Sequence, residues 1–426
     1  MTTTEQGFAA PASGPGRRPQ IALDVHGQAF RDANYAIYDD LRERCPVAWS
    51  TENGGFWVVT DYESTFDATR DDDLFTSTPG TNIPFTAEDT GAGLAAILPP
   101  IHTDPPLTGA MRSLTTRFLS PARAEAMEPE IRAIADELID EFIEAGEADL
   151  VGQLTTPLPA RVILRLLGWD EGPWPEWVTV IHTFIHGDEY GMTREQATER
   201  VTNLIFAELG RREETGAPAD DMVGCILNGE VEGRPLSVEE QFGYLLLLLF
   251  GGMDTTSGLT GNSLLRMIEQ PELTRQLIER PELMRSATEE FLRHGTPTQG
   301  LARTVSRDTD WRGVRLAKGD RALLLWAAAN RDPKAFERPD EIDLERAPNR
   351  HMAFGVGQHR CLGSNHARVM FRVMVEQVLR RLPDFALAGE PVRYGDAAAV
   401  YALKELPVRF TPGPRVSGGP VGEEIR

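Results

Sequence analysis

Apolar residues recur at helical spacing over most of the chain. Residues 29–46 predict a first helix, and residues 107–295 continue the same spacing, interrupted by glycine and proline stops. Two β-rich runs around an Asn-Gly-Gly turn predict a hairpin over residues 47–60. Further short strands are expected at 302–305, 314–326 and 400–410. The pattern predicts a mainly α protein with small β-sheets.

Two segments stand apart from this pattern. Residues 78–109 contain six prolines and scattered apolar positions, which predicts a long packed loop of the kind that often carries function. Residues 241–253 are uncharged, but 13 residues are fewer than the roughly 20 that span a membrane. They predict a buried core helix, and we expect a soluble protein.

Composition narrows the function. The chain has 426 residues, with 43 Lys and Arg against 65 Asp and Glu, for a net charge of −22. A 41% hydrophobic content is sufficient for a large core and excludes a disordered chain. The acidic balance argues against nucleic acid and anionic membranes as partners. Only Cys45, Cys225 and Cys361 are present, so we expect a cytoplasmic protein without a disulfide framework.

The richest motif runs from Phe354 to Gly363 and reads Phe-Gly-Val-Gly-Gln-His-Arg-Cys-Leu-Gly. It fails as a dinucleotide fingerprint because Arg360 occupies the third glycine position. A zinc site would draw on neighbouring histidines and Cys361, but their spacing matches no common paired-ligand pattern. Cys361 could also be an ordinary buried residue. Glycines and a following helix start instead favour a loop that stabilises a thiolate.

A second motif lies in the predicted buried helix. Gly251 and Gly252 are adjacent, and each costs about 1 kcal/mol in a helix, so they suggest a kink or a close contact. The Thr255 hydroxyl can reach the carbonyl of Gly251. Asp254 stands beside it on an apolar face, where a carboxylate is costly unless it is paired or used. A helix that merely becomes polar near one end remains an alternative.

The third motif, Glu290 with Arg293, places opposite charges three residues apart on one helix face. The spacing alone carries little information, because Glu208 with Arg211, Glu272 with Arg275, and Glu282 with Arg285 share it. Surface pairs of this kind contribute little to stability.

Taken together, these motifs resemble the cytochrome P450 superfamily, whose haem-binding loop reads Phe-Gly-x-Gly-x-His-x-Cys-x-Gly. The resemblance implies haem b with Cys361 as the fifth iron ligand, His359 near a haem propionate, and Phe354, Gly355 and Gly363 shaping the loop. The order of motifs is similar to the family's from about residue 25 to residue 412. It implies a tail over 1–24, one haem domain over 25–412 and a tail over 413–426.

The family also supplies roles for the other motifs. Asp254 would relay protons, Thr255 would organise water and hydrogen-bond the oxygen being activated, and Gly251 would leave room for O₂. Peroxide-dependent members that act on fatty acids typically carry an Arg-Pro pair here. This chain lacks that pair, so the resemblance favours O₂. Glu290 and Arg293 precede Cys361 by about 70 residues and, with Arg346, match the family's structural network.

Haem propionates need cations, which the resemblance places at Arg303 and Arg112. Thr108 stands where many members have a histidine, so one propionate contact is weakened. Met370 stands where many have a glutamate. Substrate contacts are expected from the long loop, the central helix and two later turns: Ile83, Phe85, Leu247, Phe250, Gln299, Leu301 and Val400. Their mostly apolar character predicts hydrophobic recognition.

The expected activity is hydroxylation of a small terpenoid-like or aromatic compound, as in the camphor hydroxylase type. Electrons would come from NAD(P)H through a separate ferredoxin or flavodoxin-type donor that docks near Arg112 and Arg360. Arg117, Arg350 and Arg368 would extend that positive face. A monomer is expected. Oxidative coupling, desaturation, or a non-enzymatic haem sensor or carrier are the alternatives at this point.

Overall fold

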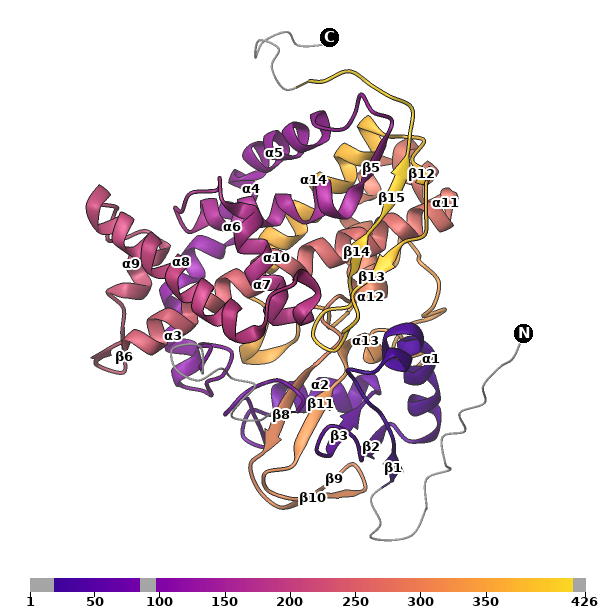
Figure 1. Cartoon of the computed structure of the whole chain (residues 1–426). Coiled ribbons are helices and arrows are strands. Elements are labelled where there is room, and N and C mark those ends of the chain that lie inside the picture. The colour runs from indigo at the N-terminus through magenta and orange to yellow at the C-terminus, as the bar shows by residue number, and fades with distance from the viewer. Residues whose placement is uncertain (1–18, 85–96, 417–426) are drawn as a thin grey trace.

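A computed structural model describes residues 19–84 and 97–416 of the chain. Helices pack around one long central helix, and the larger sheet lies against one side of this helical body (Figure 1). This is the mainly α architecture with small sheets that the pattern predicts. The helices are α1 (Gln28–Arg44), α2 (Tyr62–Arg70), α3 (Leu107–Thr116), α4 (Pro121–Ala126), α5 (Glu128–Asp140), α6 (Pro157–Leu166), α7 (Trp174–His186), α8 (Arg194–Thr215), α9 (Met222–Leu227), α10 (Val238–Glu269), α11 (Pro271–Glu279), α12 (Met284–Gly295), α13 (Trp326–Ala329) and α14 (Ser364–Arg381).

The predicted hairpin is present and belongs to the larger sheet. Strands β2 (Val47–Ser50) and β3 (Phe56–Val59) pair antiparallel around a turn in which Gly54 has a φ of +84°. Beyond β3 the sheet continues with β11 (Arg321–Leu324), β8 (Leu301–Val305) and β4 (Phe75–Thr76). The pairing of β11 with β8 fixes where the side chain of Arg303 enters the interior.

Smaller sheets connect the remaining loops. They pair β9 (Thr309–Trp311) with β10 (Val314–Leu316), β6 (Glu230–Val231) with β7 (Arg234–Pro235), and β13 (Val392–Arg393) with β14 (Leu403–Glu405). Strand β15 (Pro407–Arg409) lies between β12 (Ala386–Leu387) and β5 (Glu147–Asp149). The β13–β14 hairpin matters for function because it brings the chain near residue 394 against the helical body.

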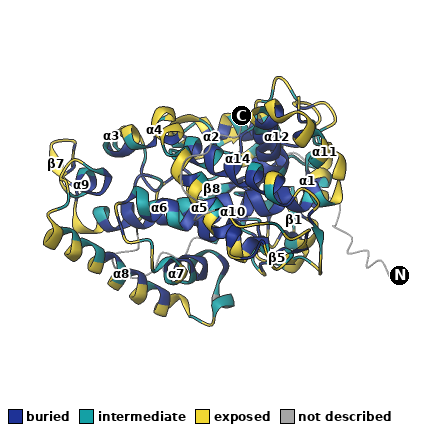
Figure 2. Ribbon diagram, turned by 90° about the horizontal axis from the view of Figure 1, so that it is seen from above, coloured by how far each residue is buried: buried dark blue, intermediate teal, exposed yellow. Residues whose placement is uncertain are grey.

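The central helix α10 is buried inside the bundle, with α6, α7 and α14 packed against it (Figures 1 and 2). It begins at a capping box in which the Ser237 hydroxyl and the Glu240 carboxylate satisfy each other's backbone N–H groups. By length and composition alone α10 could cross a membrane, but 67% of its most apolar window is buried against other protein segments. It is the core of the helical body.

Both chain ends are more ordered than the predicted tails. Strand β1 (Gln20–Ile21) pairs with β2, and Leu23 is buried, so residues 20–24 are part of the fold. At the other end, Val416 donates its backbone N–H to the carboxylate of Asp140 on α5. Short backbone pairings of this kind leave little trace in an apolar pattern, so the expected boundaries at 24 and 413 do not reflect them.

Candidate active site

The cysteine loop is a tight turn placed directly before α14. Its glycines Gly355 and Gly357 have φ angles of +64° and +77°, which side chains with a Cβ rarely adopt. The Cys361 N–H donates to the Phe354 carbonyl over 2.8 Å and closes the loop. A Cβ at Gly355 would also meet the Trp326 ring at 3.4 Å. The glycine spacing thus has a local backbone reason.

Burial and nearby positive groups shift the pKa of the Cys361 thiol in opposite directions. The residue is exposed at one side of the loop, yet the protein atoms packed around it raise the pKa of its thiol. The Gly363 backbone N–H and the guanidinium groups of Arg112, Arg360 and Arg368 lower that pKa and offset part of the burial effect. These groups would favour a thiolate once a metal ion compensates its charge.

A group of buried cationic side chains lies next to this loop. Arg303 on β8 is 1% exposed, and its Nε and Nη2 atoms have no hydrogen-bond partner within the described residues. Burial lowers its pKa to about 10, although Asp72 and Asp104 oppose the shift. His359 lies close enough for Arg303 and Arg112 to add to the burial that lowers its pKa to about 3.

Unpaired buried guanidinium nitrogens are costly, and an anionic group would satisfy them. Arg112 donates from Nη2 to the Arg360 carbonyl over 2.6 Å, which ties α3 to the cysteine loop. The expected ligand and cation residues therefore surround one region, and their chemistry fits a group with a thiolate-binding metal and carboxylates. Haem has both features.

One buried histidine beside these arginines was missed from sequence. His102 is buried, and its pKa is lowered to about 4 by burial, by Arg321 and by Arg303. His102 also acts on His359, so it belongs to the same neighbourhood. Thr108, in contrast, is fully buried in the first turn of α3 and donates its hydroxyl to the Thr103 carbonyl over 2.6 Å. Its surroundings are those of a structural residue.

The two glycines of α10 differ. Helix α10 is continuous here, so the expected kink is absent; a Cβ at Gly252 would instead meet the Ile163 side chain of α6 at 2.7 Å. Gly251 has open space around its Cβ position, and its carbonyl accepts the Thr255 hydroxyl over 3.0 Å. The close contact is at Gly252, whereas Gly251 has free space and carries the hydrogen bond from Thr255.

Asp254 is buried at 1% exposure and does not lack partners. Its carboxylate oxygens face two histidines of α7, His182 and His186. Burial raises the pKa of Asp254, but the two histidines outweigh it and bring the pKa below its ordinary value. Sequence analysis missed both histidines, although their i, i+4 spacing places them on one helix face.

Glu290, Arg293 and Arg346 converge in the interior. Arg293 and Arg346 both donate to the Glu290 carboxylate, and Asn349 adds a third contact at 3.1 Å. The other Glu and Arg pairs with the same spacing lie on the surface, as Glu272 and Arg275 show.

Within the described residues, no group of three or more His, Cys, Asp or Glu side chains could hold a metal ion, which removes the zinc alternative there.

The expected substrate residues do not all share one environment. Gln299 is fully buried. Its amide oxygen accepts hydrogen bonds from Asn34 and Tyr38, and its amide nitrogen donates to the Thr296 carbonyl. It fastens α1 to the loop after α12, and these hydrogen bonds occupy the amide that was expected to contact substrate. Phe85 lies outside the described residues.

The other expected contacts remain candidates. Leu247 and Phe250 are only partly buried on α10, and the Phe250 ring packs against Phe184 of α7 at 5.4 Å. Val400 packs near Gly258 of α10. Ile83 is buried in a hydrophobic cluster that includes apolar residues of α1. Leu301 packs beside Trp326. Leu247, Phe250 and Val400 thus lie along the same helix, α10.

The arginines expected at a docking face are only partly free. Arg368 is held by Glu289 over 2.6 Å, and Arg117 turns toward the Asp220 carbonyl near α9. Arg360 is exposed and lies close enough to act on Cys361. Arg112 and Arg360 remain the candidates next to the cysteine loop.

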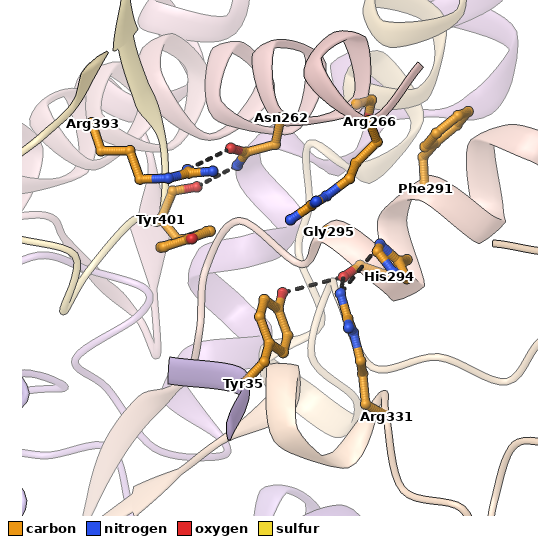
Figure 3. Close-up of a pocket in the computed structure, with 10 residues that line it drawn as sticks. Tyr35, Asn262, Arg266, Phe291, His294, Gly295, Arg331, Arg393 and Tyr401 are labelled. Carbon is orange, nitrogen blue, oxygen red and sulfur yellow. Dashed lines mark hydrogen bonds between the residues drawn. The ribbon is translucent and has the colours of Figure 1, made fainter. Parts of the chain in front are cut away.

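A separate polar cavity lies between α10, α12 and the β13–β14 hairpin (Figure 3). Three arginines point into it, and Arg331 stacks over the Tyr35 ring at 3.8 Å. A lining this charged does not suit an apolar substrate. Its lining residues are Tyr35, Asn262, Ser263, Arg266, Phe291, His294, Gly295, Arg331, Arg393 and Tyr401.

Comparison with known proteins agrees with this site. The family model for cytochrome P450 matches residues 172–385. Linalool 8-monooxygenase of Pseudomonas putida is 32% identical, covering 88% of this chain and 95% of the relative. Steroid C26-monooxygenase of Mycobacterium tuberculosis is 32% identical over 93% of this chain and 98% of the relative. The crystal structure of CYP109E1 from Bacillus megaterium in complex with testosterone has a TM-score of 0.76 and 28% identity, covering 89% of this chain and 98% of that one. This chain belongs to the cytochrome P450 family.

Proposed function

We propose that this cytochrome P450 hydroxylates a small hydrophobic compound, terpenoid-like or aromatic, with O₂ and electrons from a separate ferredoxin-type donor. Family membership makes the chain a haem b monooxygenase with a cysteine thiolate ligand and NAD(P)H as the indirect electron source. The proposal adds the substrate class, the donor class and the residues that serve them.

Cys361 would supply the thiolate, and Arg303, Arg112, His359 and His102 would hold the propionates. The observation that carries this assignment is the buried Arg303 guanidinium with two unpartnered nitrogens beside the cysteine loop. When bound, haem supplies the oxygen chemistry, which a thiolate ligand favours by pushing electron density toward the iron.

The central helix would supply protons and orientation. The Thr255 hydroxyl, anchored on the Gly251 carbonyl, can rotate to hold a water molecule or the oxygen being activated. Asp254 is the adjacent carboxylate, and its pKa is kept low by two histidines. Together they form a short route for a proton between the helix interior and the reacting oxygen.

The substrate class follows from relatives and lining together. The relatives' names include a linalool 8-monooxygenase and a steroid C26-monooxygenase, and a solved relative holds testosterone. Leu247, Phe250 and Val400 offer apolar surface along α10. Such a lining favours hydrophobic recognition with few polar anchors.

The electron donor would dock where Arg112 and Arg360 stand near Cys361. The enzyme carries a net charge of −22, so an acidic donor needs a local positive face. We place this enzyme in the cytoplasm, in line with its few cysteines. We expect it to act as a monomer.

Two measurements test the proposal. Reduced holoprotein under CO should show the red-shifted band that gives the family its name, and Cys361→His should abolish it while haem is retained. A terpenoid and aromatic panel should then contain a compound that converts low-spin to high-spin haem and is hydroxylated with NADH, a ferredoxin and its reductase. A wild-type protein without the band would refute the Cys361 assignment. Dehydrogenated or coupled products would refute hydroxylation.

A further inference from the structure

The carboxylate of Asp254 lies between two histidines that come from another helix. His186 Nε2 is 3.1 Å from Oδ2, and His182 Nε2 is 3.4 Å from Oδ1. The three side chains are each at most 1% exposed. Both carboxylate oxygens of a residue on α10 are therefore faced by imidazoles of α7, in a place that bulk water does not reach.

The histidines continue into a pair of tyrosines. His182 Nδ1 is 3.0 Å from the Tyr190 hydroxyl and 3.1 Å from the Tyr394 hydroxyl, and the two hydroxyls are 2.7 Å apart. The His186 ring stacks on Tyr394 with centroids 3.6 Å apart and 4° between the planes. Tyr190 is only partly buried. Hydrogen bonds thus link Tyr190 at the edge of the fold to His182, whose Nε2 has no hydrogen-bond partner within the described residues and faces Asp254 Oδ1 across 3.4 Å.

The charges in this chain are unequal. Burial lowers the pKa of His186, but Asp254 outweighs it and the pKa is raised above 6.5. Burial lowers the pKa of His182 to about 4, although Asp254 opposes the shift. These shifts make His186 the more readily protonated of the two histidines, beside a carboxylate that favours its ionised form.

Other charged groups packed around the chain lie toward its outer end. Glu189 of the 3₁₀ turn Asp188–Tyr190 pairs with Lys404 of β14 over 3.0 Å. The backbone carbonyl of Asp396 lies 3.4 Å from His186 Nδ1, and the Asp396 carboxylate pairs with His26. Burial raises the pKa of Tyr190 and of Tyr394, and the carboxylates of Asp254 and Glu189 add to this effect, so deprotonation of either phenol is disfavoured. The tyrosines can pass a proton along but do not store a negative charge.

We propose that His182 and His186, linked to solvent through Tyr190 and Tyr394, form the proton supply of Asp254. Asp254 favours its ionised form, so it first takes the proton of His186 Nε2 at Oδ2 and then gives a proton to the reacting side. His182 next passes its Nε2 proton to Oδ1 and takes one at Nδ1 from the Tyr190 hydroxyl. The carboxyl then returns a proton to His186 Nε2, which restores the starting charges. Tyr190 recovers its proton from solvent. One proton enters for each proton delivered. This inference rests on the proposed role of Asp254.

The first test replaces the histidine that holds the proton. His186→Gln keeps an N–H donor near Asp254 but cannot carry a transferable proton. With the compound that gives the largest high-spin shift, product formation per NADH at pH 7 should fall on the order of 10²-fold, as general acid catalysis predicts. The wild-type yield should decline as pH rises through the raised pKa of His186, and this limb should vanish in the variant.

Matched variants distinguish proton transfer through these residues from a purely structural contact between α7 and α10. Tyr190→Phe should increase the solvent isotope effect on product formation. Tyr35→Phe removes a hydroxyl that donates to the His294 carbonyl, and should leave the effect unchanged. Asp254→Asn combined with His186→Gln should be no worse than Asp254→Asn alone, since both act through one carboxylate. If His186→Gln lowers only the Tm and keeps the yield and its pH profile, the proton path is overturned.

A further readout needs no substrate. In the diamagnetic ferrous CO form, histidine NMR should report a protonated His186 at pH 7, and Asp254→Asn should lower its pKa. A neutral His186 in the wild-type protein would overturn the inference. Failure of the proposed function looks different, because Asp254→Asn would then leave the product yield unchanged while the NMR result stands.

Discussion

The Arg293 guanidinium and the Glu290 carboxylate are joined by two hydrogen bonds of 2.8 Å, and neither side chain exposes any surface. Arg293 also donates to three backbone carbonyls of the segment that leads toward the cysteine loop. Glu290 accepts in addition from Arg346 and from the Asp343 backbone. One buried ion pair thus holds the irregular chain between α13 and the loop in place.

Glu290→Gln should destabilise the holoprotein by about 3–5 kcal/mol, the usual cost of leaving a buried charge without its partner. The substitution preserves shape but leaves Arg293 and Arg346 facing a neutral amide. Chemical denaturation followed by haem absorbance measures the change.

Glu272→Gln is the control, because Glu272 and Arg275 have the same i, i+3 spacing on an exposed face. It should leave the denaturation midpoint unchanged within error. Equal loss in the two variants would mean that the network around Glu290 is no more than a surface pair.

Sequence reasoning recovered the fold class, the hairpin and the cysteine loop because each depends on local spacing. The helix over 29–46 appears as Gln28–Arg44, and two of the three loop glycines, Gly355 and Gly357, have the positive φ that their positions suggested. Glu290 could be chosen among similar pairs only by its distance from Cys361, which came from the family resemblance.

Contacts between distant segments could not be predicted in this way. His182 and His186 meet Asp254 only because α7 packs across α10, and no local pattern reports that crossing. Gln299 looked like a polar anchor for substrate, yet α1 supplies Asn34 and Tyr38 to occupy it. Polar residues in irregular segments are the hardest to place from sequence alone.

Gly252→Ala should destabilise the protein by about 1–3 kcal/mol, because its methyl group would meet Ile163 at 2.7 Å in a packed interface. Gly251→Ala meets nothing within 4 Å and should gain up to about 1 kcal/mol from helix propensity. Thermal denaturation of the two holoproteins compares them directly. A Gly252→Ala variant as stable as Gly251→Ala would contradict the close packing of α6 on α10.

Arg303→Met should stabilise the apoprotein and weaken its binding of haem. Among residues 19–84 and 97–416, two guanidinium nitrogens of Arg303 are buried without a partner, so removing them relieves a desolvation cost. A lost charge-assisted contact of about 1.5–3 kcal/mol corresponds to haem loss that is roughly 10–100-fold faster. Transfer of haem to apomyoglobin measures the rate, with the exposed Arg315→Gln as control. Unchanged haem transfer would remove Arg303 from the propionate site.

His366 should make the fold sensitive to acid. It is 3% exposed, neither ring nitrogen has a hydrogen-bond partner within the described residues, and burial lowers its pKa to about 4. Between pH 6.5 and 4 the unfolded chain binds a proton at this residue that the folded chain does not, so stability falls as pH falls. His366→Met should reduce the slope of unfolding free energy by up to about 1.4 kcal/mol per pH unit.

The opposite sign is expected at His26, whose ion pair with Asp396 raises its pKa. A raised histidine pKa adds stability that is present below pH 6.5 and is lost as pH rises through the folded value. His26→Gln should therefore lower the Tm more at pH 6 than at pH 9, whereas His366→Met should raise it most at low pH. Tm profiles of the two holoproteins that shift in the same direction with pH would contradict the charge states assigned to these histidines, because burial alone and an ion pair act on imidazole with opposite sign.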